Sequence, residues 1–429
     1  MTTDRPAVDR AGVIDQTPAV DHLTAHEQAA PMAAGRTGPL SSVRILDVTH
    51  AIAGPWATMM LADLGAEVIK VEGPTGDMQR FMGPFTRDDP DRAYGGTYGA
   101  YNRNKRCIML DLKEPGDKET FLQLVDWADA VVENQRAGVL DRLGLGYETL
   151  RERNPRLVYG AIRGFGDPRT GASPYSDWPA YDVIAQAMSS FVSMNGMGPD
   201  EPHKVGPFLG DIYPGTVGAL GILAAVFHAR ITGQGQFVDV AMVDAVTALA
   251  ETGVCRFTYM GRETLPSGNS SDSVAPFDIY PTSDGAIAIA APTNAAWTEL
   301  CGAIGRPELA AGELTKTMAL RVKNRALVDE VVAGWAAAHT NAEVMAALGG
   351  KVPCGPVNKP VDLFTDPHIK ARDMLVAVDQ PQGRPVVQVN TPMKFTETPA
   401  GIYARPPILG EHTEDIRAEL ADGRLAPRV

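Results

Sequence analysis

Short apolar segments alternate with longer segments of helical period through the first half of the chain. Residues 43–49 (VRILDVT) and 67–72 (EVIKVE) are typical of buried strands, and residues 57–64 between them predict a helix that ends at Gly65. The same pattern then predicts strands at 106–112, 130–133 and 157–164 and helices at 117–128 and 138–143. This regular alternation predicts an α/β fold with a doubly wound, Rossmann-like sheet.

The middle of the chain continues the pattern with one long apolar run. Residues 212–230 predict a buried helix, followed by a glycine turn and an alternating strand at 236–242. Residues 179–196 have helical periodicity, with Tyr181 and Asp182 at the entrance. These segments extend the α/β unit to about residue 261.

A polar stretch at 262–273 predicts a domain boundary. Beyond it, two alternating segments within 275–291 flank Ser-Asp-Gly and predict a hairpin, with helices at 295–304 and 321–338. A second, smaller α+β domain is therefore expected there. Strands near Val376 and Val386 complete the pattern.

Two segments do not fit regular elements. Residues 73–101 are rich in Gly, Pro, Asp and Tyr and are too long for an ordinary connection, so we expect them to be functional or mobile. Residues 1–38 lack the apolar run of a signal peptide or membrane span, and we expect a mostly disordered extension.

Composition narrows the possible partners and location. The 429 residues are 44% hydrophobic and 21% charged, which is typical of a globular protein, and the net charge of −13 argues against nonspecific binding to nucleic acid or anionic membranes. The four cysteines have no metal-ligand spacing, so we expect reduced thiols in a cytoplasmic protein and no metal site. The apolar run at 212–230, rich in Gly and Ala, is expected in a protein core rather than a membrane.

Asp211 is the main candidate for chemistry. It follows Gly210 directly before the long helix, so we expect it at the N-cap, where the helix dipole and free N–H groups favour an ionised carboxylate that can act as a nucleophile. A purely structural cap is the alternative. Tyr181 and Asp182 have similar alternatives, as a core aromatic residue and a helix cap.

A local concentration of basic residues interrupts the acidic background between Lys70 and Lys113. Arg80, Arg103, Lys105 and Arg106 form either a solvated face or a phosphate-binding site. The sequence has no P-loop and no GxGxxG motif here, so an ordinary ATP or NAD site is not indicated.

Several segments, taken in order, closely resemble the class III CoA-transferase family, also called the CaiB/BaiF family. They are LDVTHAIAGPWATMMLADLGAEVIKVE, YNRNKRCIMLDLK, VVENQRAGVLDRLGLGY, PAYDVIAQAMSS, the GD of FLGDIYPG, GQGQFVDVAMVDAV, VPCGPVN and LGEHTED. The resemblance runs from about Pro39 to the last thirty residues.

The resemblance implies a large CoA-binding domain made from both ends of the chain, residues 39–261 and 366–429, and a small domain at 262–365. It also implies a homodimer of two interlocked subunits. Asp211 matches the family nucleophile, which attacks an acyl-CoA thioester to give a mixed anhydride. CoA then returns to form an aspartyl-CoA thioester, and an acceptor acid leaves as its CoA ester through a second anhydride.

The other matched positions surround the CoA substrate. By resemblance, His50, Ala51, Ile52 and Ala53 line the thiol end of CoA, and Tyr181 and Asp182 flank the thioester. Leu110, Lys113, Asn134 and Arg142 match positions that contact the nucleotide or pantetheine, where cations suit phosphates. The partners implied are an acyl-CoA and an organic acid, with no further cofactor.

Departures from the family pattern separate its branches. Formyl-CoA transferases have Gln where this chain has Ile52, Trp where it has Met82, and a four-glycine loop without a counterpart between residues 266 and 289, so formyl and oxalyl transfer is disfavoured. The racemase branch, acting on 2-methylacyl-CoA, has His in place of Tyr181 as an acid/base, which favours the transferase. A racemase-like isomerase and a noncatalytic acyl-CoA binder are the alternatives.

Overall fold

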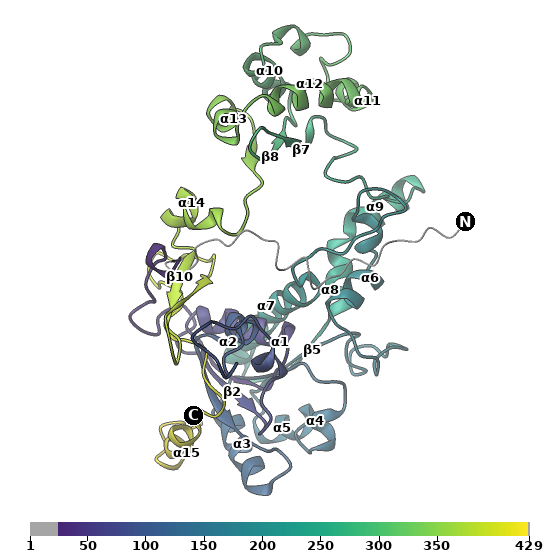
Figure 1. Cartoon of the computed structure of the whole chain (residues 1–429). Helices are drawn as coiled ribbons and strands as arrows, with labels where there is room; N and C mark the ends of the chain where they lie inside the picture. Colours follow the sequence, from purple (N-terminus) through teal and green to yellow (C-terminus); the bar gives the residue numbers. More distant parts are fainter. Residues whose placement is uncertain (1–24, 428–429) are drawn as a thin grey trace, which may run out of the picture.

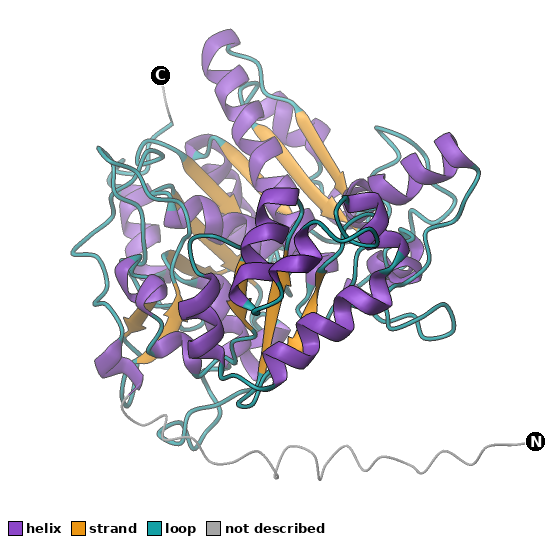
Figure 2. Ribbon diagram, turned by 90° about the horizontal axis from the view of Figure 1, so that it is seen from above, coloured by secondary structure: helices purple, strands orange, loops and turns teal. Residues whose placement is uncertain are grey.

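A sheet of six parallel strands forms the centre of the molecule (Figure 2). The computed structural model describes residues 25–427. The strand order is β3-β2-β1-β4-β5-β6. The strands are β1 (Arg44–Asp47), β2 (Glu67–Glu72), β3 (Lys105–Met109), β4 (Ala130–Glu133), β5 (Val158–Arg163) and β6 (Phe237–Ala241). Every residue of β4 and β5 is buried, as expected for central strands with both faces covered.

Helices cover both faces of this sheet and confirm the doubly wound α/β prediction. One face packs against α1 (Ala53–Asp63) and the long helix α7 (Leu209–Thr232). The other packs against α3 (Pro115–Trp127) and α5 (Tyr147–Arg153), a helix that the sequence pattern did not reveal. Since β1 and β4 are neighbours, the strand order reverses between them, and ligands of such sheets bind at this point.

Shorter helices surround the sheet and extend away from it. They are α2 (Gly96–Asn102), α4 (Val139–Arg142), α6 (Asp182–Met188), α8 (Met242–Leu249), α9 (Glu251–Met260), η1 (Ala25–Gln28), η2 (Met78–Phe81) and η3 (Val192–Met194). Residues 73–101, predicted to be functional or mobile, therefore contain η2 and all but the last residue of α2.

A second unit with its own core lies away from the six-stranded sheet (Figure 1). Its antiparallel sheet consists of β7 (Phe277–Pro281), β8 (Ala286–Ala290) and β9 (Cys354–Pro356). Its helices are α10 (Asn294–Ala303), η4 (Pro307–Ala310), α11 (Met318–Lys323), α12 (Arg325–Ala337) and α13 (Asn341–Leu348). Trp297, Leu300 and Val332 are buried at its centre.

The C-terminal part of the chain returns to the large sheet. It contains η5 (Asp362–Phe364), α14 (Pro367–Ala371), the antiparallel pair β10 (Leu375–Val378) and β11 (Val386–Val389), and α15 (Thr413–Ala421). Ile416 of α15 is fully buried in the core that also contains Ile108 of β3 and Phe121 of α3. Both ends of the chain thus contribute to one large unit.

The described part of the N-terminal extension differs from the expectation of disorder. Ala30 forms a parallel bridge to Val376, with the Ala30 N–H donating to the Leu375 carbonyl at 2.9 Å. Ala30 and Met32 also pack against a small cluster of Val376, Val378 and Ile402. Residues 25–38 therefore form a strap across the β10–β11 sheet, whereas residues 1–24 of the predicted extension lie outside the described residues.

Candidate active site

The candidate site lies at the carboxyl ends of β1 and β4, where the strand order reverses. His50 follows β1 and Asn134 follows β4 directly. The His50 N–H donates to Asn134 Oδ1 at 2.9 Å, and Asn134 Nδ2 donates to the His50 carbonyl at 2.7 Å. This reciprocal pair fixes the main chain of His50 to the neighbouring strand.

The next residue of the loop, Ala51, is fixed by the buried carboxylate of Asp77. The Ala51 N–H donates to Asp77 Oδ1 at 3.2 Å, and Asp77 forms an ion pair with Lys70 at 3.5 Å. Ala51 has a φ of 60°, an uncommon value for a residue with a side chain, which these contacts stabilise. Ile52 and Ala53 follow, both buried, and α1 begins at Ala53.

Asp211 lies in the first turn of α7, which packs very closely against the start of α1. A Cβ atom added to Gly215, one turn after Asp211, would lie 2.4 Å from the Ala53 carbonyl oxygen. Only glycine allows the two helix starts to approach this closely. Trp56 Nε1 also donates to Thr216 Oγ1 at 3.0 Å, so α1 and α7 are joined beside Asp211.

The prediction that Asp211 is the N-cap is wrong. The helix begins at Leu209, which makes Asp211 its third residue. The cap comes instead from Asp182 of α6, whose Oδ1 accepts a hydrogen bond from the Gly210 N–H at 2.8 Å. Asp182 is itself fixed by Gln186 Nε2 at 2.7 Å and by Lys204 at 3.4 Å.

The protonation of Asp211 also differs from the expectation. Burial and then the nearby Asp182 carboxylate raise the pKa of Asp211 to about 7. Within residues 25–427, no group donates a hydrogen bond to the Asp211 side chain, which is 8% exposed. The first three N–H groups of α7 donate to Pro207, Asp182 and Phe208, so they do not stabilise its charge.

The remaining predicted residues differ in their exposure. Lys113 follows β3 and Arg142 lies in α4, and both side chains are exposed at the same carboxyl edge as His50. Leu110 is buried in the core, so only its main chain can face a ligand. Tyr181 precedes α6 and is 61% exposed, which contradicts the core-aromatic interpretation.

The basic residues between Lys70 and Lys113 form ion pairs instead of an open phosphate site. Arg80 pairs with Glu72 at 2.6 Å, Arg103 with Asp63 at 2.7 Å, and Lys105 with Asp47 at 2.9 Å, and all six side chains are buried. Arg106 pairs with Glu419 of α15 at 2.8 Å. These four cations therefore stabilise the fold around the site, and Lys113 and Arg142 are better placed for phosphate.

A cavity of about 1140 Å³ adjoins the first turn of α7. Trp56, Tyr101, Ile212 and Thr216 line the part next to α1 and α7. Residues from 84–103, residues 25 and 26 and the return segment line most of the rest. No sequence pattern marks Trp56, Tyr101 or Thr216 as site residues. They line the cavity because α1, α2 and α7 meet there, and no local sequence pattern predicts this contact.

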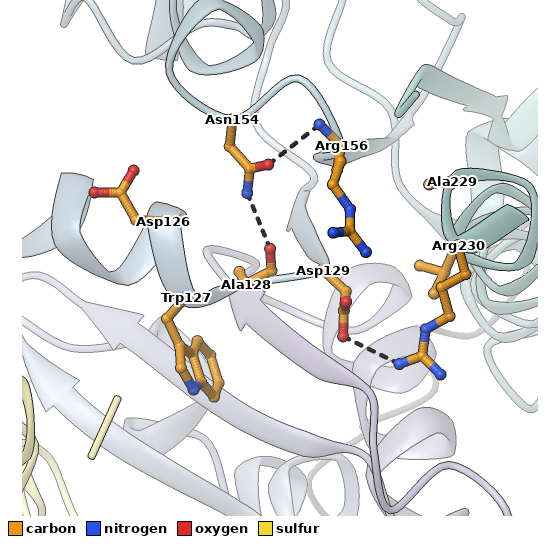
Figure 3. A pocket seen from close by; sticks show the side chains of 9 residues that line it. Asp126, Trp127, Ala128, Asp129, Asn154, Arg156, Ala229 and Arg230 are labelled. Atoms are coloured by element: carbon orange, nitrogen blue, oxygen red, sulfur yellow. Dashed lines mark hydrogen bonds and ion pairs between the residues drawn. The ribbon is translucent and has the colours of Figure 1, made fainter. Parts of the chain in front are cut away.

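A second, polar pocket lies at the other end of α7 (Figure 3). Arg230 pairs there with Asp129 at 3.4 Å, and Asn154 Nδ2 donates to the Ala128 carbonyl at 3.2 Å. It holds about 30 Å³, enough for water but not for an organic substrate. Nineteen residues of helix place Arg230 about 28 Å from Asp211.

Comparisons with known proteins identify the family of the chain. The profile of CoA-transferase family III matches residues 40–413. A succinyl-CoA:mesaconate CoA-transferase of Haloarcula hispanica is 43% identical over 91% of this chain and 99% of its own length. A succinate–glutarate CoA-transferase of Agrobacterium fabrum is 36% identical, covering 90% of this chain and 96% of its own.

A solved structure agrees as well. The crystal structure of a CaiB/BaiF family protein from Brucella suis superposes with a TM-score of 0.80 at 33% identity, covering 90% of this chain and all of that one. Because the profile match and the relatives each span most of the chain, the protein belongs to CoA-transferase family III.

Proposed function

We propose that this protein is a cytoplasmic enzyme that transfers CoA from an acyl-CoA to a carboxylic acid, with Asp211 as the covalent nucleophile. The supporting observation is a buried carboxylate without a described hydrogen-bond donor, next to a rigid loop at the switch point of the sheet. Such a carboxylate is poorly solvated and therefore reactive once ionised.

The proposed reaction exchanges one CoA thioester for another through two mixed anhydrides. An Asp211 oxygen attacks the thioester carbon, and the C–S bond breaks to give a mixed anhydride and CoA thiolate. The thiolate attacks the Asp211 carbonyl, which releases the first acid and leaves an aspartyl-CoA thioester. The acceptor carboxylate attacks this thioester, and CoA then returns to the acceptor acyl carbon and frees Asp211.

The surrounding residues have roles that follow from their positions. The loop from His50 to Ala53 places main-chain groups beside the start of α7, where the thiol end of CoA would lie. Lys113 and Arg142 provide exposed cations for the phosphates at the same edge. Asp182 accepts a hydrogen bond from the Gly210 N–H and so fixes the orientation of the next residue, Asp211.

The names of two relatives support a proposal for the substrate class. The Haloarcula and Agrobacterium proteins are named for succinyl-CoA or succinate together with mesaconate or glutarate, all dicarboxylic acids. We therefore propose succinyl-CoA as donor and a four- or five-carbon dicarboxylic acid as acceptor. Acyl-CoA donors tested in pairs with carboxylic acids, with CoA products identified by mass spectrometry, should give the highest kcat/KM for such a pair.

The test of the chemistry is the Asp211→Asn variant, with Asp415→Asn as control. Asp415 is an exposed first-turn acid of α15, remote from the site, and its variant should retain full activity. Asp211→Asn should lose at least about 10³-fold in kcat, since an amide cannot act as the nucleophile that carries the acyl intermediate. Tight CoA binding without turnover by the wild type would instead support the binder, and solvent deuterium at the acyl α-carbon without acceptor would support the isomerase.

A further inference from the structure

Tyr101 has an unusual environment next to the candidate nucleophile. It is in the last turn of α2 and half-buried, and it lines the 1140 Å³ cavity together with Ile212 and Thr216 of α7. Within residues 25–427, its hydroxyl makes no hydrogen bond. The hydroxyl lies at the wall of the cavity and is therefore available to donate a hydrogen bond to a ligand there.

The ring of Tyr101 is positioned by contacts that lead directly to α7. It packs edge-on against Trp56, with ring centroids 6.0 Å apart. Trp56 in turn donates to Thr216, and its Cδ1 would lie 3.0 Å from a Cβ at Gly215. Since Gly215 lies one turn after Asp211, the phenol is held beside the first turn of α7.

We propose that the Tyr101 hydroxyl is a catalytic hydrogen-bond donor to the oxyanion that forms on the acyl carbon when Asp211 attacks it. This inference rests on the proposed function. As the Asp211 oxygen bonds to the thioester carbon, the C=O electron pair moves to the carbonyl oxygen, which accepts a hydrogen bond from Tyr101. The pair returns when the C–S bond breaks, and no proton is transferred.

The electrostatics of Tyr101 suit this role. Burial and then the Asp211 carboxylate raise the pKa of Tyr101, so the phenol stays protonated and can donate. No hydrogen bond joins the two side chains among the described residues, so the Tyr101 hydroxyl remains available to a reacting carbonyl group. A hydrogen-bond donor that stabilises the charge developing in the transition state can lower the activation barrier substantially.

The experiment compares Tyr101→Phe with Tyr94→Phe. Tyr94 lines the same cavity, but its hydroxyl has no part in the proposed chemistry. Tyr101→Phe keeps the ring against Trp56 and should slow the release of free acid from succinyl-CoA, in a single turnover without acceptor, by about 10²-fold. The Kd for CoA and the Tm should be unchanged, and Tyr94→Phe should match the wild type within about twofold.

Three results would overturn the proposal. They are acid release by Tyr101→Phe at the wild-type rate, a higher KM with unchanged acid release, or an equal loss in Tyr94→Phe. Asp211→Asn separates this proposal from the proposed function. If that variant releases no acid while Tyr101→Phe behaves as wild type, only the role of Tyr101 fails, whereas acid release by Asp211→Asn contradicts the function itself.

Discussion

At the residue scale, Asp211 combines a catalytic position with an unfavourable environment for charge. Its pKa of about 7 means that half of the free enzyme carries a protonated, non-nucleophilic Asp211 near neutral pH. We expect kcat/KM to fall about tenfold per pH unit below pH 7 and to level off above it. A pH profile of kcat/KM for the acyl-CoA checks this. A profile flat from pH 5 to 8 would show that Asp211 ionises normally.

The same shift predicts an effect on stability. The pKa of Asp211 is higher in the folded protein than in the unfolded chain. Ionisation of Asp211 at high pH therefore lowers the free energy of unfolding, and this loss is absent when both states are protonated. Asp211→Asn should therefore be more stable than the wild type at pH 8, by roughly 1–4 kcal/mol, and the difference should shrink as the pH falls below 7. Thermal unfolding at pH 5 and pH 8 measures it, and a constant difference would contradict the shift.

At the element scale, the close contact of α1 and α7 determines where Asp211 lies. Gly215→Ala would place a methyl group 2.4 Å from the Ala53 carbonyl oxygen and should force the helices apart. We expect a loss of about 1–3 kcal/mol in the free energy of unfolding and at least tenfold lower kcat.

Gly334→Ala in α12 is the matched control for this contact. A Cβ there meets no atom within 4 Å, so the substitution should be neutral or stabilise by up to about 1 kcal/mol. Chemical denaturation and turnover of both variants give the comparison. Equal behaviour of the two would show that the contact at Gly215 is not required.

The N-terminal strap gives a second prediction at this scale. Deleting residues 1–35 removes the Ala30 bridge to Val376 and the packing of Met32 on the β10–β11 sheet. These contacts involve the return segment, and the deletion also removes Ala25 and His26, which line the large cavity. The Tm should fall by a few degrees. A deletion that leaves Tm unchanged would show that the strap contributes no stability.

Sequence patterns predicted the elements better than the contacts between them. The alternation in residues 43–164 gave the parallel sheet because burial on both faces leaves a readable pattern. The cap of α7 was not predictable, because it comes from Asp182, twenty-eight residues before Gly210 in the chain. Burial and the nearby Asp182 also raise the pKa of Asp211, which no local pattern reveals. The position of Tyr101 likewise depends on the packing of α2.

At the scale of the whole molecule, the outer faces of α7 and α9 are apolar and exposed. Leu220, Phe227 and Ile231 are each more than 65% exposed on α7, and Phe257 and Tyr259 are exposed on α9. Clusters of exposed apolar side chains mark association surfaces. We propose that a second copy covers them in an interlocked homodimer. In each chain, two connections join the small domain to the large domain (Figure 1).

The solution mass tests this assembly. Light scattering should give about twice the 45.7 kDa of one chain at micromolar concentration, and a Phe227→Glu variant should lower the Tm or the yield of dimer. Lys316→Glu, an exposed change on the small domain, is the control and should leave the mass unchanged. A monomeric wild type would contradict the dimer.

The most direct test of the central claim is to trap the acyl group on the enzyme. The protein is incubated with succinyl-CoA and hydroxylamine, digested, and analysed by mass spectrometry. We predict a hydroxamate on the peptide that contains Asp211, formed only with the thioester present and absent from Asp211→Asn. An unmodified Asp211 in an enzyme that still turns over would contradict the account.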